Sequence, residues 1–407
     1  ETIRGLRAND IITDEFKCLR YDTLVETNNG LEKIGDIVNN TKDVKLINKN
    51  GEFESPSDFI KTPLTDAYEI IVKNGYSFTC SSTHKVLTSN GWKICKDLTN
   101  KDYLIFDNKY IFPESNIKIE NLTLDEDLAE LLGLLVSEGS VTNKKIFIIT
   151  TTDLQMVDYI KDKYRYLNPK VYITKKYKDK RGWVCKESYR IVFNNKEFRE
   201  KLFKLGLDYK RAINKEIPSS ILQSPKNIVI AFLKGLFYGD GSVFTFSCVN
   251  MQRLGCSYYS VSEKLINQVQ VLLWKTGYLS NKQSRKSKIS NNLQYLLRLN
   301  GKYAFDFIKE LNVDKFNSII NNKDFYVTDR DKLGYVYEKN NKFIASIYYN
   351  GKDNYIGSFN SLLEANKQIK DFINNKPICL KVKSIKKLDE KEQLYDFTLP
   401  DTHSFYG

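Results

Sequence analysis

The chain has 407 residues and a formal net charge of +13, with 26 tyrosines and 23 phenylalanines. This length predicts two to four domains, and no apolar run is long enough to span a bilayer. The charged N-terminus leads us to expect no signal peptide, and seven cysteines without a repeating spacing exclude a disulfide framework. We therefore expect a cytoplasmic, monomeric protein without a membrane partner. Positive charge interleaved with aromatic residues is typical of nucleic-acid binding, although Lys- and Asn-rich proteomes produce the same composition without that function.

Residues 1–17 contain an apolar run that ends in Asp14 and Glu15. The pattern resembles the Walker B region of a phage terminase large subunit. That resemblance implies an ATPase strand that delivers Asp14 to Mg²⁺ and Glu15 to the attacking water. A strand ending in Asp-Glu is common in ATPases and not rare elsewhere.

Residues 18–108 consist of short alternating apolar and polar runs separated by turn signals. Residues 23–27, for example, precede an Asn-Asn-Gly sequence that is typical of a hairpin turn. This pattern predicts an all-β unit of hairpins. A second short β segment, residues 377–407, closes the chain.

Residues 120–331 have helical periodicity and an internal duplication, which is the mark of a repeated structural unit. Residues 131–141 and 233–243 are each an apolar run with a glycine in the middle and an acid-Gly pair near the end. Each copy continues with a strand-like run, an amphipathic helix and a basic hairpin-like stretch. The duplication predicts two copies of one α/β unit.

The central glycines of the two motifs are Gly133 and Gly235. A glycine inside a helix costs about 1 kcal/mol against alanine, and it is favoured where two helices approach closely. If the motif helices pack there, Glu138 and Asp240 meet, and the glycine after each acid suits the left-handed residue that ends a helix. Two carboxylates in one place favour a divalent metal that clamps a scissile phosphate, and Mg²⁺ needs few carboxylates. The alternative, two core helices with incidental acids, explains one motif better than two at matching offsets.

These motifs resemble those of a LAGLIDADG homing endonuclease. The resemblance implies two αββαββα-like halves whose sheets form a saddle over the major groove of double-stranded DNA, with Glu138 and Asp240 holding Mg²⁺. A Lys-x-Ile-Pro segment makes Lys215 a residue that polarises the attacking water or the scissile phosphate, and Lys315 is its counterpart in the second copy. The basic hairpins imply DNA contacts through the following side chains: Lys175, Lys176, Lys178, Lys180, Arg181, Lys282, Arg285, Lys286 and Lys288. The first acid is Glu, where Asp is commoner in the family, so a nuclease-inactive form remains an alternative.

Residues 332–376 predict three short strands and a helix, which is small but sufficient for an independent unit. The segment is similar to the ethylene-response-factor (Apetala) DNA-binding domain, which lays a three-stranded sheet in the major groove. The resemblance makes Lys342 and Lys352 candidate DNA contacts. The alternative is a β-hairpin that decorates the nuclease.

The chain contains two histidines, His84 and His403, and histidine is the side chain best suited to proton transfer near neutral pH. Either one alone is better explained as an ordinary core or surface residue. Their neighbours favour catalysis, because residues 18–27 resemble the opening block of an intein. Ser81 to His84 resembles the second splicing block, with Ser81 in place of the usual Thr, and Asp396 with His403 matches the penultimate block.

The intein resemblance implies a role for each of these residues. The Cys18 sulfur attacks the preceding carbonyl carbon and converts that peptide bond into a thioester. His84 protonates the departing amide nitrogen, and Ser81 holds the scissile amide. Asp396 tunes the Cys18 thiol and helps to pass the chain to its acceptor, while His403 assists asparagine cyclisation. Splicing needs no cofactor, and its partners are the flanking exteins in cis, with residues 1–17 as the N-terminal flank.

The family's final block, His-Asn followed by Cys, Ser or Thr, does not occur before Gly407. We therefore expect N-terminal cleavage but not complete splicing. The explanations for the missing block are a truncated sequence, a split intein or loss of the last step. Two rival functions remain, a DNA-binding intein remnant without nuclease activity and a Hedgehog-like self-cleaving domain.

The expected fold class is multidomain. An all-β Hint horseshoe splicing domain is interrupted by an α/β (α+β) duplicated LAGLIDADG endonuclease and by a small β-sheet-plus-helix DNA-binding module. The expected location is the cytoplasm of a phage-infected or bacterial host cell.

Overall fold

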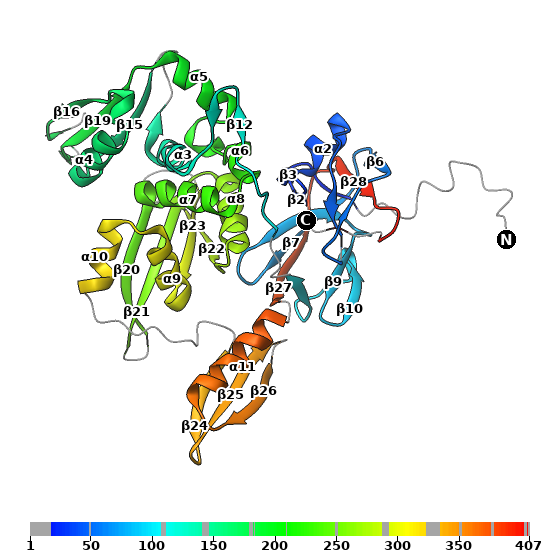
Figure 1. Ribbon diagram of the computed structural model, residues 1–407. Helices are drawn as coiled ribbons and strands as arrows, with labels where there is room; N and C mark the ends of the chain where they lie inside the picture. Colours follow the sequence, from blue (N-terminus) through cyan, green and yellow to red (C-terminus); the bar gives the residue numbers. More distant parts are fainter. Residues whose placement is uncertain are drawn as a thin grey trace. The chain divides into compact units, whose positions relative to one another are not determined.

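Figure 1 shows the computed structural model of the chain. The structure describes residues 18–48, 50–106, 111–140, 146–178, 182, 184–208, 210–248, 251–286, 293–322, 334–349, 352–375, 378–402 and 405. The chain divides into two compact units, residues 1–111 with 329–407 and residues 112–328. Asp14 and Glu15 lie outside the described residues, so the host ATPase remains a prediction.

The first unit is built mainly from antiparallel strands. Outside residues 334–375, its elements are β1 (Leu19–Arg20), β2 (Leu24–Thr27), β3 (Gly30–Lys33), α2 (Ile34–Asn40), β4 (Leu46–Ile47), β5 (Phe53–Glu54), β6 (Asp58–Lys61), β7 (Ala67–Val72), β8 (Ser77–Ser81), β9 (Lys85–Thr88), β10 (Gly91–Ile94), the 3-10 helix η1 (Cys95–Asp97), β11 (Tyr103–Phe106), β27 (Ile378–Lys387) and β28 (Leu394–Thr398). One sheet has the order β10-β9-β11-β27-β7-β8-β1-β28-β6, and a second has the order β3-β2-β4-β5. Strands β27 and β28 lie between strands from the start of the chain, so the two predicted β segments form one β unit.

The turn chemistry of this unit follows the sequence pattern. Strands β2 and β3 are joined by a turn in which Gly30 has a φ of 100°, a left-handed conformation that glycine adopts without strain. The Thr27 hydroxyl donates to the Gly30 carbonyl at 3.0 Å and accepts from the Asn29 N–H at 3.0 Å. Val25, in the middle of β2, is fully buried and fixes which face of the hairpin is covered.

The second unit contains two copies of one α/β arrangement. Its elements are β12 (Lys118–Ile119), β13 (Leu122–Thr123), α3 (Glu126–Glu138), β14 (Gly139–Ser140), β15 (Phe147–Thr151), α4 (Leu154–Lys163), η2 (Arg165–Leu167), β16 (Lys170–Thr174), β17 (Tyr177–Lys178), β18 (Val184–Cys185), β19 (Ser188–Phe193), α5 (Lys196–Lys204), η3 (Ala212–Asn214), α6 (Ser219–Leu222), α7 (Lys226–Asp240), β20 (Gly241–Cys248), β21 (Met251–Ser260), α8 (Glu263–Lys275), β22 (Asn281–Lys286), β23 (Leu293–Asn300), α9 (Gly301–Leu311) and α10 (Asp314–Asn322). The two main sheets have the matching orders β14-β15-β19-β16 and β20-β21-β23-β22. The predicted duplication is confirmed.

The two motif helices, α3 and α7, lie side by side (Figure 1), and their central glycines form the contact. A Cβ added at Gly133 would lie 2.2 Å from the Phe232 carbonyl oxygen, and one at Gly235 would lie 2.0 Å from the Glu130 carbonyl oxygen. No side chain fits at either position, so the prediction of close helix contact is confirmed. The contact brings the C-terminal ends of the two helices together.

The glycines that end the motif helices have a different role from the one predicted. Gly139 and Gly241 both have a φ of −81°, so neither is left-handed and the prediction of left-handed caps is wrong. A Cβ at Gly139 would lie 2.1 Å from the Leu135 carbonyl oxygen, and one at Gly241 would lie 2.2 Å from the Phe237 carbonyl oxygen. Glycine is required there because the chain turns from helix into strand directly beneath the helix end.

Residues 334–375 form β24 (Gly334–Lys339), β25 (Lys342–Tyr349), β26 (Lys352–Phe359) and α11 (Leu362–Asn375). The strands make a three-stranded antiparallel sheet in the order β24-β25-β26. Ala345, Ala365 and Ile369 form the core between sheet and helix. The segment has the predicted three strands and helix, so the hairpin alternative is wrong.

Candidate active sites

Cys18 directly precedes β1, which is the central strand of the trio β8-β1-β28. Leu19 pairs with Cys80 of β8 and with Tyr395 of β28 in antiparallel register. The same register places Ser81 and Asp396 on the two sides of Cys18. The Ser81 N–H donates to the Cys18 carbonyl at 2.9 Å.

The Cys18 thiol is fully buried. Burial raises its pKa, and the nearby negative charge of Asp396 raises it further. The thiol is therefore neutral at rest, and a base must remove its proton before the sulfur can attack. Asp396, itself buried, accepts from the Phe397 N–H at 2.9 Å.

His84 lies in the turn between β8 and β9, and its side chain is half-buried. Its N–H donates to the Ser81 carbonyl at 3.2 Å, and its carbonyl accepts from the Cys95 N–H at 2.8 Å. Its ring lies 6.4 Å from the Phe78 ring. The turn fixes the backbone of His84 beside Ser81, whose own N–H binds the Cys18 carbonyl.

Residues 401 and 402 of the first unit are held by a residue that the sequence did not reveal. Glu54 of β5 accepts from the Asp401 N–H at 2.8 Å and from the Thr402 hydroxyl at 2.6 Å. Burial raises the pKa of Glu54, but hydrogen bonds from Thr402, Asp401 and Asn48 outweigh it and lower the pKa to about 2. The predicted catalytic residue His403 lies outside the described part of the chain, one residue beyond this anchor.

Glu138 and Asp240 meet at the C-terminal ends of α3 and α7, as predicted. Burial and the charge of Asp240 raise the pKa of Glu138 to about 7, against the opposing effect of Lys215 and Lys315. Burial also raises the pKa of Asp240, again opposed by both lysines. Two crowded carboxylates, with Glu138 half-buried and Asp240 open to solvent, fit a divalent cation, since its charge would remove their repulsion. Within the described residues no group of three His, Cys, Asp or Glu side chains occurs, so water or phosphate oxygens would complete such a site.

Lys215 and Lys315 lie at these same helix ends. The Lys215 ammonium donates to the Val136 carbonyl at 2.6 Å and to the Ser137 carbonyl at 2.8 Å. The Lys315 ammonium donates to the Tyr238 carbonyl, the residue equivalent to Val136, at 2.9 Å. Both lysines therefore bind the carbonyl end of a motif helix, where cations are favoured.

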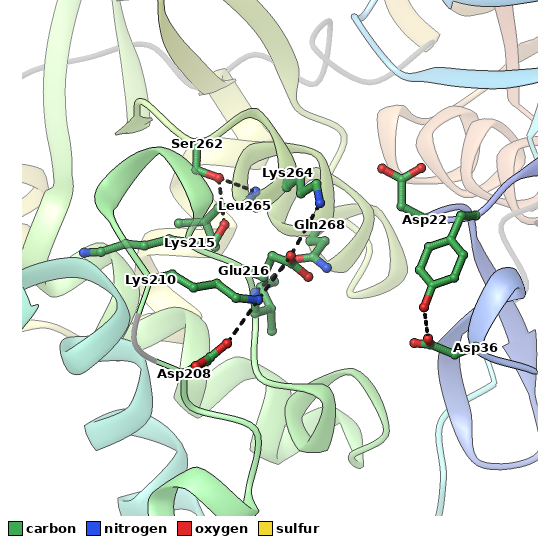
Figure 2. Close-up of polar contacts among 12 residues, drawn as sticks. Asp22, Asp36, Asp208, Lys210, Lys215, Glu216, Ser262, Lys264, Leu265 and Gln268 are labelled. Atoms are coloured by element: carbon green, nitrogen blue, oxygen red, sulfur yellow. Dashed lines mark hydrogen bonds and ion pairs between the residues drawn. The ribbon is translucent and has the colours of Figure 1, made fainter. Parts of the chain in front are cut away.

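The segment that carries Lys215 is fixed by α8, and Figure 2 shows these contacts. The Ser262 hydroxyl donates to the Lys215 carbonyl at 2.7 Å and accepts from the Leu265 N–H at 3.2 Å. Gln268 accepts from the Ile217 N–H at 2.8 Å. A separate contact lies in the first unit, where Asp36, labelled in Figure 2, accepts a hydrogen bond from the Tyr21 hydroxyl.

The predicted basic residues of the two sheets do not all lie on one face. Lys175, Lys176 and Lys178 are exposed after β16, whereas Lys180, Arg181 and Lys288 lie outside the described residues. In the second sheet, the Arg285 guanidinium lies 5.4 Å from the Tyr259 ring, and Lys286 is exposed at the strand end.

Lys282 departs from this group. It pairs with the buried Leu297 in the register of β22 and β23, so its side chain lies on the helix-covered face. Its ammonium donates to Asn267 of α8 at 2.7 Å. In the small module, Lys342 is exposed at the start of β25, and Lys352 begins β26.

The open face of the second sheet carries cations that the sequence did not single out. The Arg298 guanidinium lies 4.7 Å from the Phe244 ring and 4.4 Å from the Phe246 ring. The neighbours Leu297 and Leu299 are buried on the other face. The alternation in β23 was the available signal, because it places Arg298 away from the helices. In the first sheet Arg190, paired with Thr150 and Tyr172, occupies the open face in the same way.

Comparisons with known proteins give one family match and several partial relatives. The family model for the intein splicing domain matches residues 24–407. The replicative DNA helicase DnaB of Synechocystis is 26% identical over 238 residues, which cover 55% of this chain and 25% of the helicase. The ribonucleoside-diphosphate reductase NrdEB subunit alpha of Bacillus subtilis is 26% identical over 306 residues, which cover 66% and 26% of the two chains. The chain thus spans about a quarter of the length of these relatives.

Two solved structures match parts of the chain. The DnaB intein from Synechocystis has a TM-score of 0.20 at 22% identity, and the match covers 22% of this chain and 68% of that one. Variants of the homing endonuclease I-DmoI have a TM-score of 0.31 at 15% identity, with 46% and 96% coverage. Among the described residues no helix is long and apolar enough to cross a membrane. Since the family model matches most of its length, the chain belongs to the intein splicing-domain family.

Proposed function

We propose that this intein forms a thioester at Cys18. The observation that carries the proposal is the position of β1 between β8 and β28, which sets Cys18 beside Ser81 and Asp396. The sulfur attacks the carbonyl carbon of residue 17 and the C–N bond breaks. The amino group of Cys18 leaves with a proton, and residue 17 becomes a thioester.

Three groups support this step. The buried Asp396 accepts the thiol proton, because a carboxylate next to a neutral thiol is the base at hand. His84 protonates the departing nitrogen, and the Ser81 hydroxyl holds the scissile amide. Passage to a downstream acceptor and asparagine cyclisation assisted by His403 complete the splicing proposal, with the exteins as partners in cis.

Mass spectrometry of the purified chain with and without dithiothreitol tests this proposal. We expect thiol-dependent release of residues 1–17, and we expect His84→Ala to slow it by about 100-fold. Lys85→Ala, at an exposed neighbouring position, is the control and should release at the normal rate. Equal rates in wild type and His84→Ala would contradict the assignment of His84.

We propose a second activity, double-strand DNA cleavage by the duplicated unit. The meeting of Glu138 and Asp240 at the ends of two glycine-packed helices supports it. These carboxylates would hold Mg²⁺, which when bound stabilises phosphate charge and activates water. Lys215 and Lys315 supply fixed positive charge at the scissile phosphates, and the helix contact sets the spacing between the two carboxylates.

The open faces of the two sheets would bind the DNA of the intein-less host gene. Arg285, Arg298 and Arg190 lie on these faces, and arginine beside aromatic rings suits both phosphate and base contacts. The three-stranded sheet of residues 334–359 would add a second contact through Lys342 and Lys352. Cleavage of a plasmid carrying the intein-less gene, dependent on added Mg²⁺, tests the nuclease. Binding without cleavage would favour the nuclease-inactive remnant instead.

The Hedgehog-like alternative shares the Cys-to-His step but needs no endonuclease. Specific DNA cleavage would exclude this alternative. The absence of both DNA binding and DNA cleavage would favour it. The terminase host, the monomeric state and the cytoplasmic location remain predictions. Sequencing of the gene on both sides of the intein tests the host.

A further inference from the structure

The two halves of the duplicated unit differ at one position next to the paired lysines. Helices α4 and α8 are equivalent, and each begins with a residue that caps its N-terminus, Asp153 in α4 and Ser262 in α8. Each capping residue contacts the lysine segment of the other half. The cap of one half is charged and that of the other is neutral, so the two contacts differ in kind.

Asp153 uses its two carboxylate oxygens for different partners. Oδ1 accepts from the Gln155 N–H at 3.0 Å and from the Met156 N–H at 3.3 Å, which caps the helix. Oδ2 forms an ion pair with the Lys315 ammonium at 3.8 Å. The side chains of Asp153 and Lys315 are 30% and 27% exposed. The ion pair is therefore separate from the capping function.

Ser262 treats Lys215 differently. Its hydroxyl donates to the backbone carbonyl of Lys215, whereas Asp153 pairs with the side-chain ammonium of Lys315. The Lys215 ammonium binds two carbonyls of α3, whereas the Lys315 ammonium binds one carbonyl of α7 and the Asp153 carboxylate. The Lys215 ammonium thus binds two neutral carbonyls, whereas the Lys315 ammonium also faces a carboxylate whose negative charge partly offsets its field at the site.

We propose that Asp153 is a positioning residue that makes the two strand-cleaving halves unequal by restraining Lys315. The inference rests on the proposed nuclease function and assigns to that site a fixed order of strand cleavage. The strand served by Lys215 is cut first, and the strand served by Lys315 is cut later, because its lysine gives less charge to the phosphate. Nicked circles therefore accumulate before linear product.

Asp153→Asn is the decisive variant, because asparagine caps a helix as well as aspartate and removes only the charge. Asp125→Asn is its matched control. Asp125 is also an N-cap, accepting from the Leu128 N–H at 2.8 Å, and the substitution changes the net charge equally. It stands at the opposite end of α3, about 20 Å from the paired carboxylates by helix geometry.

The experiment follows a supercoiled plasmid that carries the intein-less host gene through nicked to linear forms, with each strand end-labelled separately. We expect Asp153→Asn to reduce the ratio of first-cut to second-cut rates by up to about fivefold, the upper limit for a partly exposed ion pair. Asp125→Asn should leave the ratio unchanged. In metal-free buffer, fluorescence anisotropy should show Asp153→Asn binding the same duplex more tightly than Asp125→Asn.

The outcomes separate the two proposals. Failure of the wild-type chain to cut either strand overturns the nuclease proposal, and the strand order with it. Cutting at an unchanged strand ratio in Asp153→Asn overturns the role of Asp153 alone. Equal shifts in both variants would trace the effect to net charge and also overturn it.

Discussion

The proposed splicing centre and the proposed nuclease centre bring distant side chains together in different ways. Cys18 and Asp396 are distant in sequence and meet because β1 and β28 pair within one sheet. Glu138 and Asp240 meet because one helix occurs twice and the copies pack through glycines. The first centre depends on strand order and the second on symmetry, so the two should fail independently.

The largest expected effect is on DNA cleavage, and it should leave the splicing chemistry unchanged. Glu138→Gln removes a carboxylate from the paired acids, and we expect DNA cleavage to fall by about 1000-fold. Thiol-dependent release of residues 1–17 should be unchanged. Glu126→Gln, an exposed acid in the first turn of the same helix, serves as the control in both assays. Retained cleavage in Glu138→Gln would remove the metal-site assignment.

The next effect tests the helix contact. Gly235→Ala should raise the helix propensity of α7, yet its Cβ would collide with the Glu130 carbonyl. We expect the free energy of opening of α3 and α7 to fall by about 2 kcal/mol. Amide hydrogen exchange of these helices measures it, with Lys226→Ala at the exposed start of α7 as control. A stabilised α7 would show that the helices do not need this approach.

A smaller effect concerns the stability of the splicing unit against unfolding at low pH. The folded pKa of Glu54 is about 2, below the ordinary value of 4.5, so ionised Glu54 stabilises the fold above pH 4.5. That stabilisation is lost as the pH falls from 4.5 through 2. Urea unfolding between pH 7 and pH 3 should therefore show a steeper loss for the wild type than for Glu54→Gln. Glu52→Gln, an exposed neighbour, should follow the wild type, and identical profiles for all three would remove Glu54 as an anchor.

The smallest effect compares the two faces of the second sheet. Arg298→Met on the open face should weaken DNA binding by about three- to tenfold. It should also lower the number of counterions released on binding, read from the salt dependence of the affinity, by about one. Lys282→Met, on the helix-covered face, removes the same charge and should bind normally. Anisotropy titrations at several salt concentrations distinguish them. Weaker binding by Lys282→Met alone would reverse the assignment of the faces.

The sequence predicted the duplication, the paired acids and the interrupted β unit, because glycine spacing and strand alternation are local patterns. It failed at Gly139 and Gly241, where a steric contact, and not a left-handed turn, requires glycine. It also failed at Lys282, because the face of a strand residue depends on the register of its neighbour.

Residues such as Glu54, Arg298 and Asp153 carry no motif of their own. Their importance comes from partners distant in sequence, which only the fold brings near. Glu54, for example, binds residues 401 and 402, and no pattern around β5 indicates that contact.

The central claim, thioester formation at Cys18, is tested most directly by trapping the acyl group. The purified chain is incubated with 2-mercaptoethanesulfonate, and the released fragment is weighed by mass spectrometry. The structure predicts a fragment of residues 1–17 that carries the thiol adduct at its C-terminus, and predicts no fragment from Cys18→Ala. Release of residues 1–17 from Cys18→Ala, or release without the adduct from the wild type, would contradict it.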